Sequence, residues 1–125
     1  MMIEYTVKVT ENGSKFWYLN GKFHREDGPA CEHTDGTKYW YINGKLHRED
    51  GPAIEWADGS KSWYLNDELH REDGPAIEWD DGTKSWYLNG EKLSEQEHRD
   101  RMSPVKVLSV ADIEQLLGHR VKIVK

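Results

Sequence analysis

The stretch that decides the fold is His47-Arg48-Glu49-Asp50-Gly51-Pro52-Ala53, followed by IEWADGSKSWYLN at 54–66. The string HREDGPA recurs unchanged at 24–30 and 70–76. The period is 23 residues, and it gives full repeats at 21–43, 44–66 and 67–89. Self-similarity at such a period is typical of a repeat protein whose units stack on their neighbours.

The array has incomplete repeats at both ends. A half repeat at 12–20 precedes it, and a partial repeat at 90–93 ends it. We therefore divide the chain into a repeat array, 1–93, and a C-terminal segment, 94–125.

The C-terminal segment is expected to be a small α/β unit ordered helix-strand-helix-strand. Ser94 and Glu97 form a capping-box pattern that opens a helix through about Met102. A strand is expected at 105–108, a second helix after Ser109 with Gly118 past its end, and a final strand at 121–124.

Within a repeat the apolar residues alternate with period two, which indicates strands. Trp63 and Leu65 fall on one face and Ser62 and Tyr64 on the other, while Ile54 and Trp56 go together. Asp58-Gly59 and Asn66 supply turns that tolerate positive φ, and Gly51 is expected to relax φ at the bend before Pro52. Each repeat is predicted to be one β-hairpin with a longer connection. The predicted fold class is mainly β, a repetitive antiparallel meander.

The predicted core is one face of this sheet, because columns of aromatic and aliphatic side chains outweigh surface charge pairs. Its residues are Trp17, Trp40, Trp63, Trp86, Trp56, Trp79, Ile54, Ile77, Leu65 and Leu88. A single sheet buries only one face. The cover of the Trp columns is expected to be the curl of the sheet, the C-terminal segment or a second copy of the chain.

Charge and composition exclude several partner classes. Lys and Arg number 17 against 23 Asp and Glu, a formal net charge of −6, so no nucleic-acid partner is expected. No apolar run approaches about 18 residues, so no membrane partner is expected. Cys31 is the single cysteine, at a position where later repeats have Ile. With no signal-peptide pattern, these features predict a soluble, cytoplasmic protein.

The repeated histidines are not expected to bind metal. If each repeat adds two strands, His24, His47 and His70 lie about 9–10 Å apart, whereas zinc ligands each lie about 2 Å from the ion. No cofactor or enzymatic activity is expected either, since catalysis needs different groups converging on one point. We expect Asp50 to cap its turn, Arg48 to reach a carboxylate of a neighbouring repeat, and His47 to pack flat on an aromatic ring.

The predicted partner-binding surface combines a tyrosine column with arginines and an acidic end. Tyrosine is enriched at interfaces, although such a column can also serve only cross-strand pairing. The last full repeat carries two basic and seven acidic residues and would suit a cationic partner. The candidate residues are Tyr41, Tyr64, Tyr87, Arg48, Arg71, Asp80 and Asp81.

The order Asn43-Gly44-Lys45-Leu46-His47, then Gly51, then Ala57-Asp58-Gly59-Ser60-Lys61 resembles the MORN repeat over about residues 12–93. The chain departs from that repeat where Arg-Glu-Asp-Gly-Pro replaces its usual His-Gly-x-Gly turn. This MORN-like variant, and the ending at 108–125, look like small accessory proteins of tailed bacteriophages. The resemblance implies consecutive hairpins in an elongated sheet and carries over no catalytic residue.

The leading functional hypothesis is a non-enzymatic binding protein. It would be a phage accessory factor in the host cytoplasm that binds and modulates or inhibits a host protein, for example a component of a defence system. One alternative is a protein that sequesters a nucleotide-like ligand, since Arg pairs with phosphate and stacks on aromatic rings. Another is a self-assembling structural protein, including a homodimer, because open sheet edges invite pairing between chains.

Overall fold

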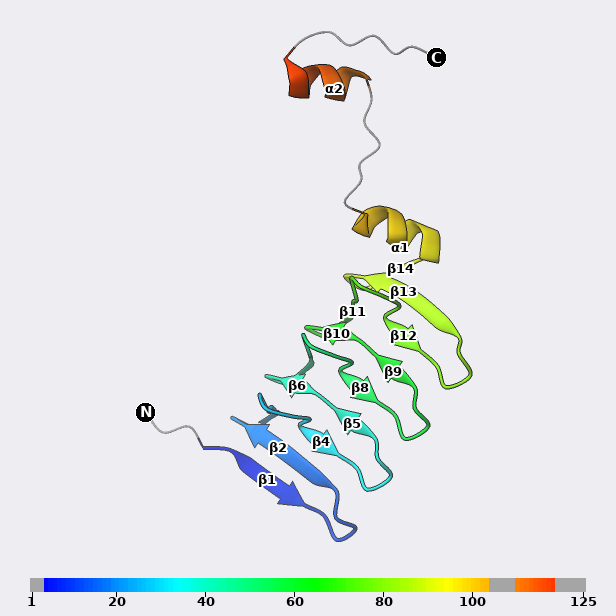
Figure 1. Ribbon diagram of the computed structural model, residues 1–125. Coiled ribbons are helices and arrows are strands. Elements are labelled where there is room, and N and C mark those ends of the chain that lie inside the picture. Colours follow the sequence, from blue (N-terminus) through cyan, green and yellow to red (C-terminus); the bar gives the residue numbers. More distant parts are fainter. Residues whose placement is uncertain (1–3, 104–109, 119–125) are drawn as a thin grey trace.

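The computed structural model describes residues 4–103 and 110–118. It shows a ladder of hairpins stacked side by side, with two short helices near the C-terminus (Figure 1). The early strands are β1 (Thr6–Val9), β2 (Lys15–Leu19), β3 (Lys22–Phe23), β4 (Cys31–Glu32), β5 (Lys38–Tyr39), β6 (Tyr41–Ile42) and β7 (Lys45–Leu46). The later strands are β8 (Ile54–Glu55), β9 (Lys61–Ser62), β10 (Tyr64–Leu65), β11 (Glu68–Leu69), β12 (Ile77–Glu78), β13 (Lys84–Leu88) and β14 (Glu91–Leu93).

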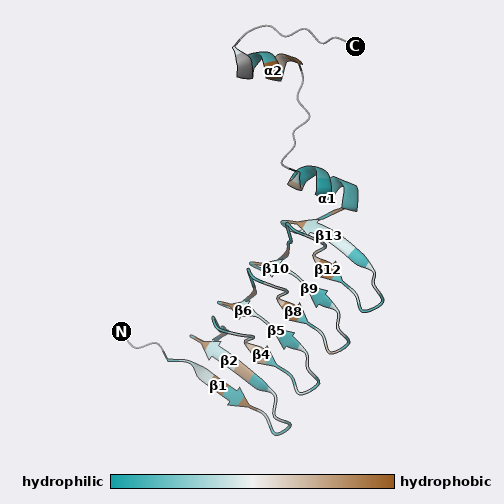
Figure 2. Cartoon of the chain, in the orientation of Figure 1, coloured by the Kyte–Doolittle hydropathy of each residue, from teal (hydrophilic) through white to brown (hydrophobic). Residues whose placement is uncertain are grey.

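The main sheet confirms the mainly β, antiparallel meander. Nine strands follow the order β1-β2-β4-β5-β8-β9-β12-β13-β14, and β3 pairs with β2 beside this path. Each repeat therefore adds two strands to the sheet, as the 23-residue period predicts. Hydrophobic residues occupy only short stretches of these strands, and the connecting loops are largely hydrophilic (Figure 2).

Each full repeat contains one complete hairpin, as the sequence predicted, and the predicted longer connection includes a second hairpin that crosses the boundary between repeats. In the central repeat, β8 and β9 flank the Asp58-Gly59 loop, and β10 pairs with β11 of the following repeat across the Asn66-Asp67 turn. The turn residues have φ of 49° and 69°, the left-handed conformation that Asn and Asp tolerate. The chain leaves the strand conformation at Trp63, between β9 and β10. This interruption separates the second hairpin from the main sheet.

The strand register corrects the predicted faces. Ile54 and Ile77 both pair with Ser62, and directly paired residues point to the same side of a sheet. The isoleucines, and Trp56 by alternation, therefore lie on the face opposite Trp63. We call the side of Trp17, Trp40, Trp63 and Trp86 the tryptophan face, and the side of Tyr18, Tyr41, Tyr64 and Tyr87 the tyrosine face.

The core is thin and consists mostly of small residues. Ala30, Ala53 and Ala76 are 0% exposed and Ser62 is 1% exposed, whereas the tryptophans are only half-buried and Trp79 is 40% exposed. The prediction of a tryptophan core is therefore wrong, although Ile54 and Leu88 of the predicted core are buried, at 6% and 7% exposed. A single-layer sheet has no second layer to cover large rings, so only side chains close to the backbone are buried completely.

The first repeat compensates for its small cysteine. Cys31 lies between Phe16 and Tyr39, where the later repeats pair an isoleucine with a serine. In the first repeat the large side chains are Phe16 and Tyr39 on the neighbouring strands, and the small one is Cys31 between them. His33, which stands in place of a tryptophan, makes edge contacts with Phe16 and Tyr39 at ring-centroid distances of 5.5 and 5.6 Å.

Side chains also link successive repeats through backbone groups. His47 Nδ1 accepts a hydrogen bond from the Asn66 N–H (3.0 Å), and His24 and His70 do the same with Asn43 and Asn89. The ring of His47 is thus used as an acceptor, where the sequence predicted aromatic stacking. Beside the loops at the other ends of the strands, Ser60 Oγ accepts a hydrogen bond from the Asp80 N–H (3.0 Å). Side-chain hydrogen bonds therefore fix successive repeats to one another in addition to the strand pairing.

The C-terminal helices agree with the prediction. α1 (Glu95–Met102) begins with the capping box of Ser94 and Glu97, contacts β13 and β14, and donates a hydrogen bond from buried His98 Nε2 to Arg71 O (2.6 Å). α2 (Val110–Leu117) is followed by Gly118, whose φ is 72°. The predicted strands at 105–108 and 121–124 lie outside the described residues.

Candidate functional site: grooves on the tryptophan face

Each HREDGPA segment places an arginine on a tryptophan. The Arg48 guanidinium carbon lies 4.0 Å from the ring centroid of Trp40. Trp40 immediately precedes β6, and Arg48 follows β7 of the same hairpin. Arg25 on Trp17 and Arg71 on Trp63 repeat this stacking at 3.9 and 3.8 Å. The ring orients the planar cation and covers one face of it.

The arginine is held by acceptors of its own repeat. Arg48 donates through Nε to Asp50 (3.1 Å) and through Nη1 to the carbonyl of Pro52 (3.0 Å), and Glu55 lies 3.6 Å away. The prediction that Arg48 reaches a carboxylate of a neighbouring repeat is therefore wrong. Asp50 likewise binds the guanidinium, where the sequence predicted a cap on its own turn.

The glycine of HREDGPA makes room for this cation. A Cβ on Gly51 would lie 2.8 Å from the Arg48 guanidinium carbon, and Gly28 and Gly74 give 2.9 and 2.8 Å with Arg25 and Arg71. None of these three glycines has φ in the left-handed region. The requirement for glycine is thus close approach of a side chain, and the expected relaxation of φ is not its reason. The guanidinium is enclosed between Gly51 and the Trp40 ring.

The remaining acidic residue of each segment faces the solvent. Glu49 is 82% exposed and its Oε1 lies 3.5 Å from His47 Nε2. Because His47 Nδ1 accepts from the Asn66 N–H, the hydrogen of the ring is on Nε2. Glu26 and Glu72 repeat this placement at 3.6 Å.

Between successive segments lie grooves with a tryptophan in the wall. One groove, ≈ 740 Å³, lies between Arg25–Pro29 and His47–Asp50 and includes Trp40 and Ile42. The next, ≈ 570 Å³, includes Trp63 and Leu65. Two smaller ones lie at Trp17 beside β1 (≈ 400 Å³) and at Trp86 beside α1 (≈ 410 Å³). The grooves at Trp40 and Trp63 are thus equivalent, whereas β1 forms one wall at Trp17 and α1 forms one wall at Trp86.

These grooves are acidic. The grooves at Trp40 and at Trp63 each contain four carboxylates and two guanidinium groups, which leaves a net charge of −2. The groove at Trp86 has three carboxylates and one guanidinium, again −2. The six carboxylates of the three segments are 70–88% exposed. They can therefore reach a ligand without leaving a buried charge.

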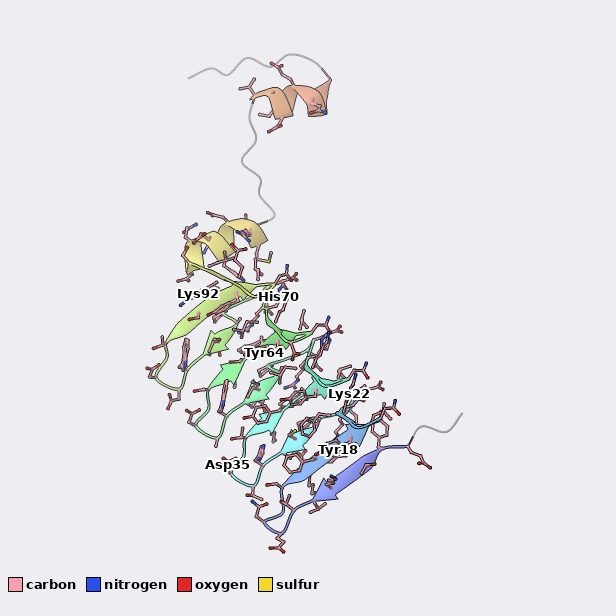
Figure 3. All side chains as sticks on the ribbon, turned by 180° about the vertical axis from the view of Figure 1, so that it is seen from behind. Tyr18, Lys22, Asp35, Tyr64, His70 and Lys92 are labelled. Carbon is pink, nitrogen blue, oxygen red and sulfur yellow. The ribbon has the colours of Figure 1, made fainter. Side chains whose placement is uncertain are left out.

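The predicted site residues do not form one surface. Tyr41, Tyr64 and Tyr87 lie on the tyrosine face, where each pairs with a residue of the adjoining strand of its hairpin. Arg48 and Arg71 lie on the tryptophan face. Asp80 and Asp81 belong to the loop between β12 and β13. The equivalent loop residue Asp35 lies on one side of the array, where the strands turn, and Lys22 lies on the other side (Figure 3).

The tyrosines and the loop aspartate have shifted acidities with simple causes. Partial burial raises the pKa of Tyr41 and Tyr64, so both hydroxyls stay protonated at neutral pH. Hydrogen bonds from Thr83 lower the pKa of Asp81, because they stabilise the carboxylate. Asp81 thus holds its own loop together.

Sequence reasoning missed the contribution of Trp40, Trp63, Glu49 and Glu72 to the grooves. The alternation pattern predicts these tryptophans in a core, and a core residue is not expected to contact a partner. The repeat pattern itself indicates that these tryptophans are accessible, because a single-layer sheet has no second layer to cover four large rings. The glutamate of each HREDGPA string also lines a tryptophan groove; these residues are Glu26, Glu49 and Glu72.

The described residues contain no group of three or more His, Cys, Asp or Glu side chains placed to hold a metal ion. Within the same part of the chain, no helix has the length and apolar character needed to cross a bilayer. Burial raises the pKa of the Cys31 thiol to about 11, so it is protonated at neutral pH. Comparisons of the chain with protein-family models, curated proteins and solved structures give no match.

Proposed function

We propose that this chain is a non-enzymatic binding protein that engages a partner protein through the grooves of its tryptophan face. The observation that carries the proposal is the recurrence of acidic, tryptophan-walled grooves along the array, at Trp17, Trp40, Trp63 and Trp86. A repeated groove offers the same contacts at regular intervals. That arrangement suits an extended partner better than it suits a reaction at one centre.

The proposed biological setting follows from the MORN-like resemblance. The partner is a bacterial host protein, and the chain is an accessory factor of a tailed phage that acts in the host cytoplasm. The rigid linkage between repeats supports a binding role, because a preformed surface loses little conformational entropy when a partner docks. The structure of the grooves makes a small nucleotide-like ligand the weaker alternative, since a phosphate would meet a net negative charge.

A second candidate, self-assembly, is favoured by the edge of the sheet. β1 is exposed along its whole length, and Val7 and Val9 are 47% and 62% exposed. An uncovered edge strand can pair with the same strand of a second chain. Light scattering over a range of concentrations tests this candidate, which predicts a dimer that Val7→Lys abolishes.

The test of the binding proposal is capture from bacterial lysate with two matched triple variants. E26Q/E49Q/E72Q removes one exposed carboxylate from each segment, and Y41F/Y64F/Y87F changes only hydroxyl groups on the tyrosine face. We expect saturable capture that the glutamate variant loses and the tyrosine variant keeps. The reverse pattern moves binding to the tyrosine column, and absence of any saturable partner refutes the binding function.

A further inference from the structure

The grooves identify the chemistry of the segment that they would bind. The grooves at Trp17, Trp40 and Trp63 each already contain one example of this contact, a guanidinium stacked on tryptophan and paired with carboxylates. The two central grooves share Arg48, Glu49 and Asp50, and together they hold six carboxylates and three guanidinium groups, a net charge of −3. A second planar cation entering the groove would therefore meet both a tryptophan and unneutralised carboxylates.

The spacing of the grooves selects the conformation of the segment. Each repeat adds two strands to the sheet, which places equivalent groups about 9.4–9.8 Å apart. A polyproline II helix has three residues per turn and rises about 9.3 Å per turn, so every third side chain points the same way at nearly this interval. Over four grooves the accumulated mismatch is only about 1 Å, within the reach of an arginine side chain.

Other regular conformations fit less well. In a β-strand, side chains on one side recur every two residues, about 6.6–6.8 Å apart, and miss the groove spacing. In an α-helix, positions seven apart recur at about 10.5 Å, and the mismatch grows to about 3 Å over four grooves. An aromatic-walled groove is also the usual receptor of a proline-rich segment.

We infer that the tryptophan face binds a proline-rich polyproline II segment with an arginine at every third position, one arginine in each groove. This inference rests on the proposed function and specifies the partner's binding segment. The segment runs along the array, across the strands. Its prolines pack over the wall residues, including Ile42 and Leu65, and its arginines pair with Glu26, Glu49 and Glu72.

The direct test is calorimetric titration of the full chain with a peptide of four Pro-Pro-Arg units. The control peptide has the same eight prolines and four arginines, with the arginines contiguous at one end. We expect the spaced peptide to bind at least about tenfold more tightly than the control, because only its cations match the grooves. Equal affinities mean attraction by charge alone and overturn the inference.

Matched variants of the chain locate the binding. E26Q/E49Q/E72Q should weaken the spaced peptide at least about tenfold, whereas E4Q/E11Q/D80N removes the same charge outside the grooves and should weaken it less than about threefold. Similar losses in both variants overturn the inference. One outcome is capture from lysate of a protein that the spaced peptide does not displace. In that case this inference fails and the binding function stands. If no protein is captured, the binding function fails whatever the peptide does.

Discussion

The enclosure of Arg48 between Trp40 and Gly51 predicts a substitution whose effect changes sign with its background. Gly51→Ala places a Cβ 2.8 Å from the guanidinium carbon, so the cation must leave its position. It then loses the bond from Nη1 to Pro52 O and the stacking on Trp40. In an Arg48→Ala background these contacts are already absent, and the added Cβ no longer meets the guanidinium.

The magnitude follows from those contacts. A hydrogen bond from a charged donor contributes about 1.5–3 kcal/mol and an exposed cation–π contact about 0.5–1 kcal/mol, and part is recovered when the arginine moves into water. Gly51→Ala should therefore destabilise the wild-type chain by about 2 kcal/mol. In the Arg48→Ala background it should stabilise by about 0.4–1 kcal/mol, because alanine restricts the unfolded chain. The coupling energy is then about 2–3 kcal/mol.

Urea unfolding followed by tryptophan fluorescence measures all four proteins of the cycle. Gly59→Ala is the matched control, since Gly59 has φ of +96° and no atom lies within 4 Å of an added Cβ. Its cost comes from backbone strain and should be the same with and without Arg48. A Gly51→Ala cost that is equal in the two backgrounds would refute the close-approach explanation of the glycine.

Three further predictions concern the links within and between repeats. His47→Ala should lower the free energy of unfolding by about 1 kcal/mol, because the Asn66 N–H loses its acceptor; an unchanged urea midpoint contradicts this role. Cys31, with its pKa raised to about 11, should resist maleimide at pH 7.5 until denaturant is added, and rapid native labelling contradicts the burial. Asp81 has a lowered pKa, so its stabilising effect is complete above the unfolded value of 3.8 and is lost as pH falls through the folded value. Asp81→Asn should remove that part of the acid dependence, and a pH titration of the urea midpoint checks it.

Several elements could be predicted from the sequence because their causes are local. The Asn66 turn and the Gly59 loop need positive φ, which Asn and Gly tolerate, and both turns form as expected. The capping box of Ser94 and Glu97 likewise involves only four consecutive residues and forms at the predicted helix start. The 23-residue period was sufficient for the meander, since each unit had to pair with a copy of itself.

The faces could not be predicted in the same way. Alternation shows which residues of one strand share a side, but it does not show which side of the next strand they join. The register of β8 on β9 decides that Ile54 stands beside Ser62 and opposite Trp63. The tyrosine and arginine columns were therefore combined in one predicted surface, although they lie on opposite sides of the sheet.

The amino-acid sequence by itself determined the repeat, the turns and the even spacing of like residues, because each depends on a few neighbouring side chains and on backbone geometry. The tertiary structure alone decided that Arg48 stacks on Trp40, that Gly51 must lack a side chain, and that carboxylates and tryptophans form grooves. The β6–β7 hairpin brings Arg48 to Trp40, and the stacking of one repeat on the next forms the groove between them. The geometry of these contacts depends on register and on where the strand is interrupted, and neither is encoded in the alternation of a single segment.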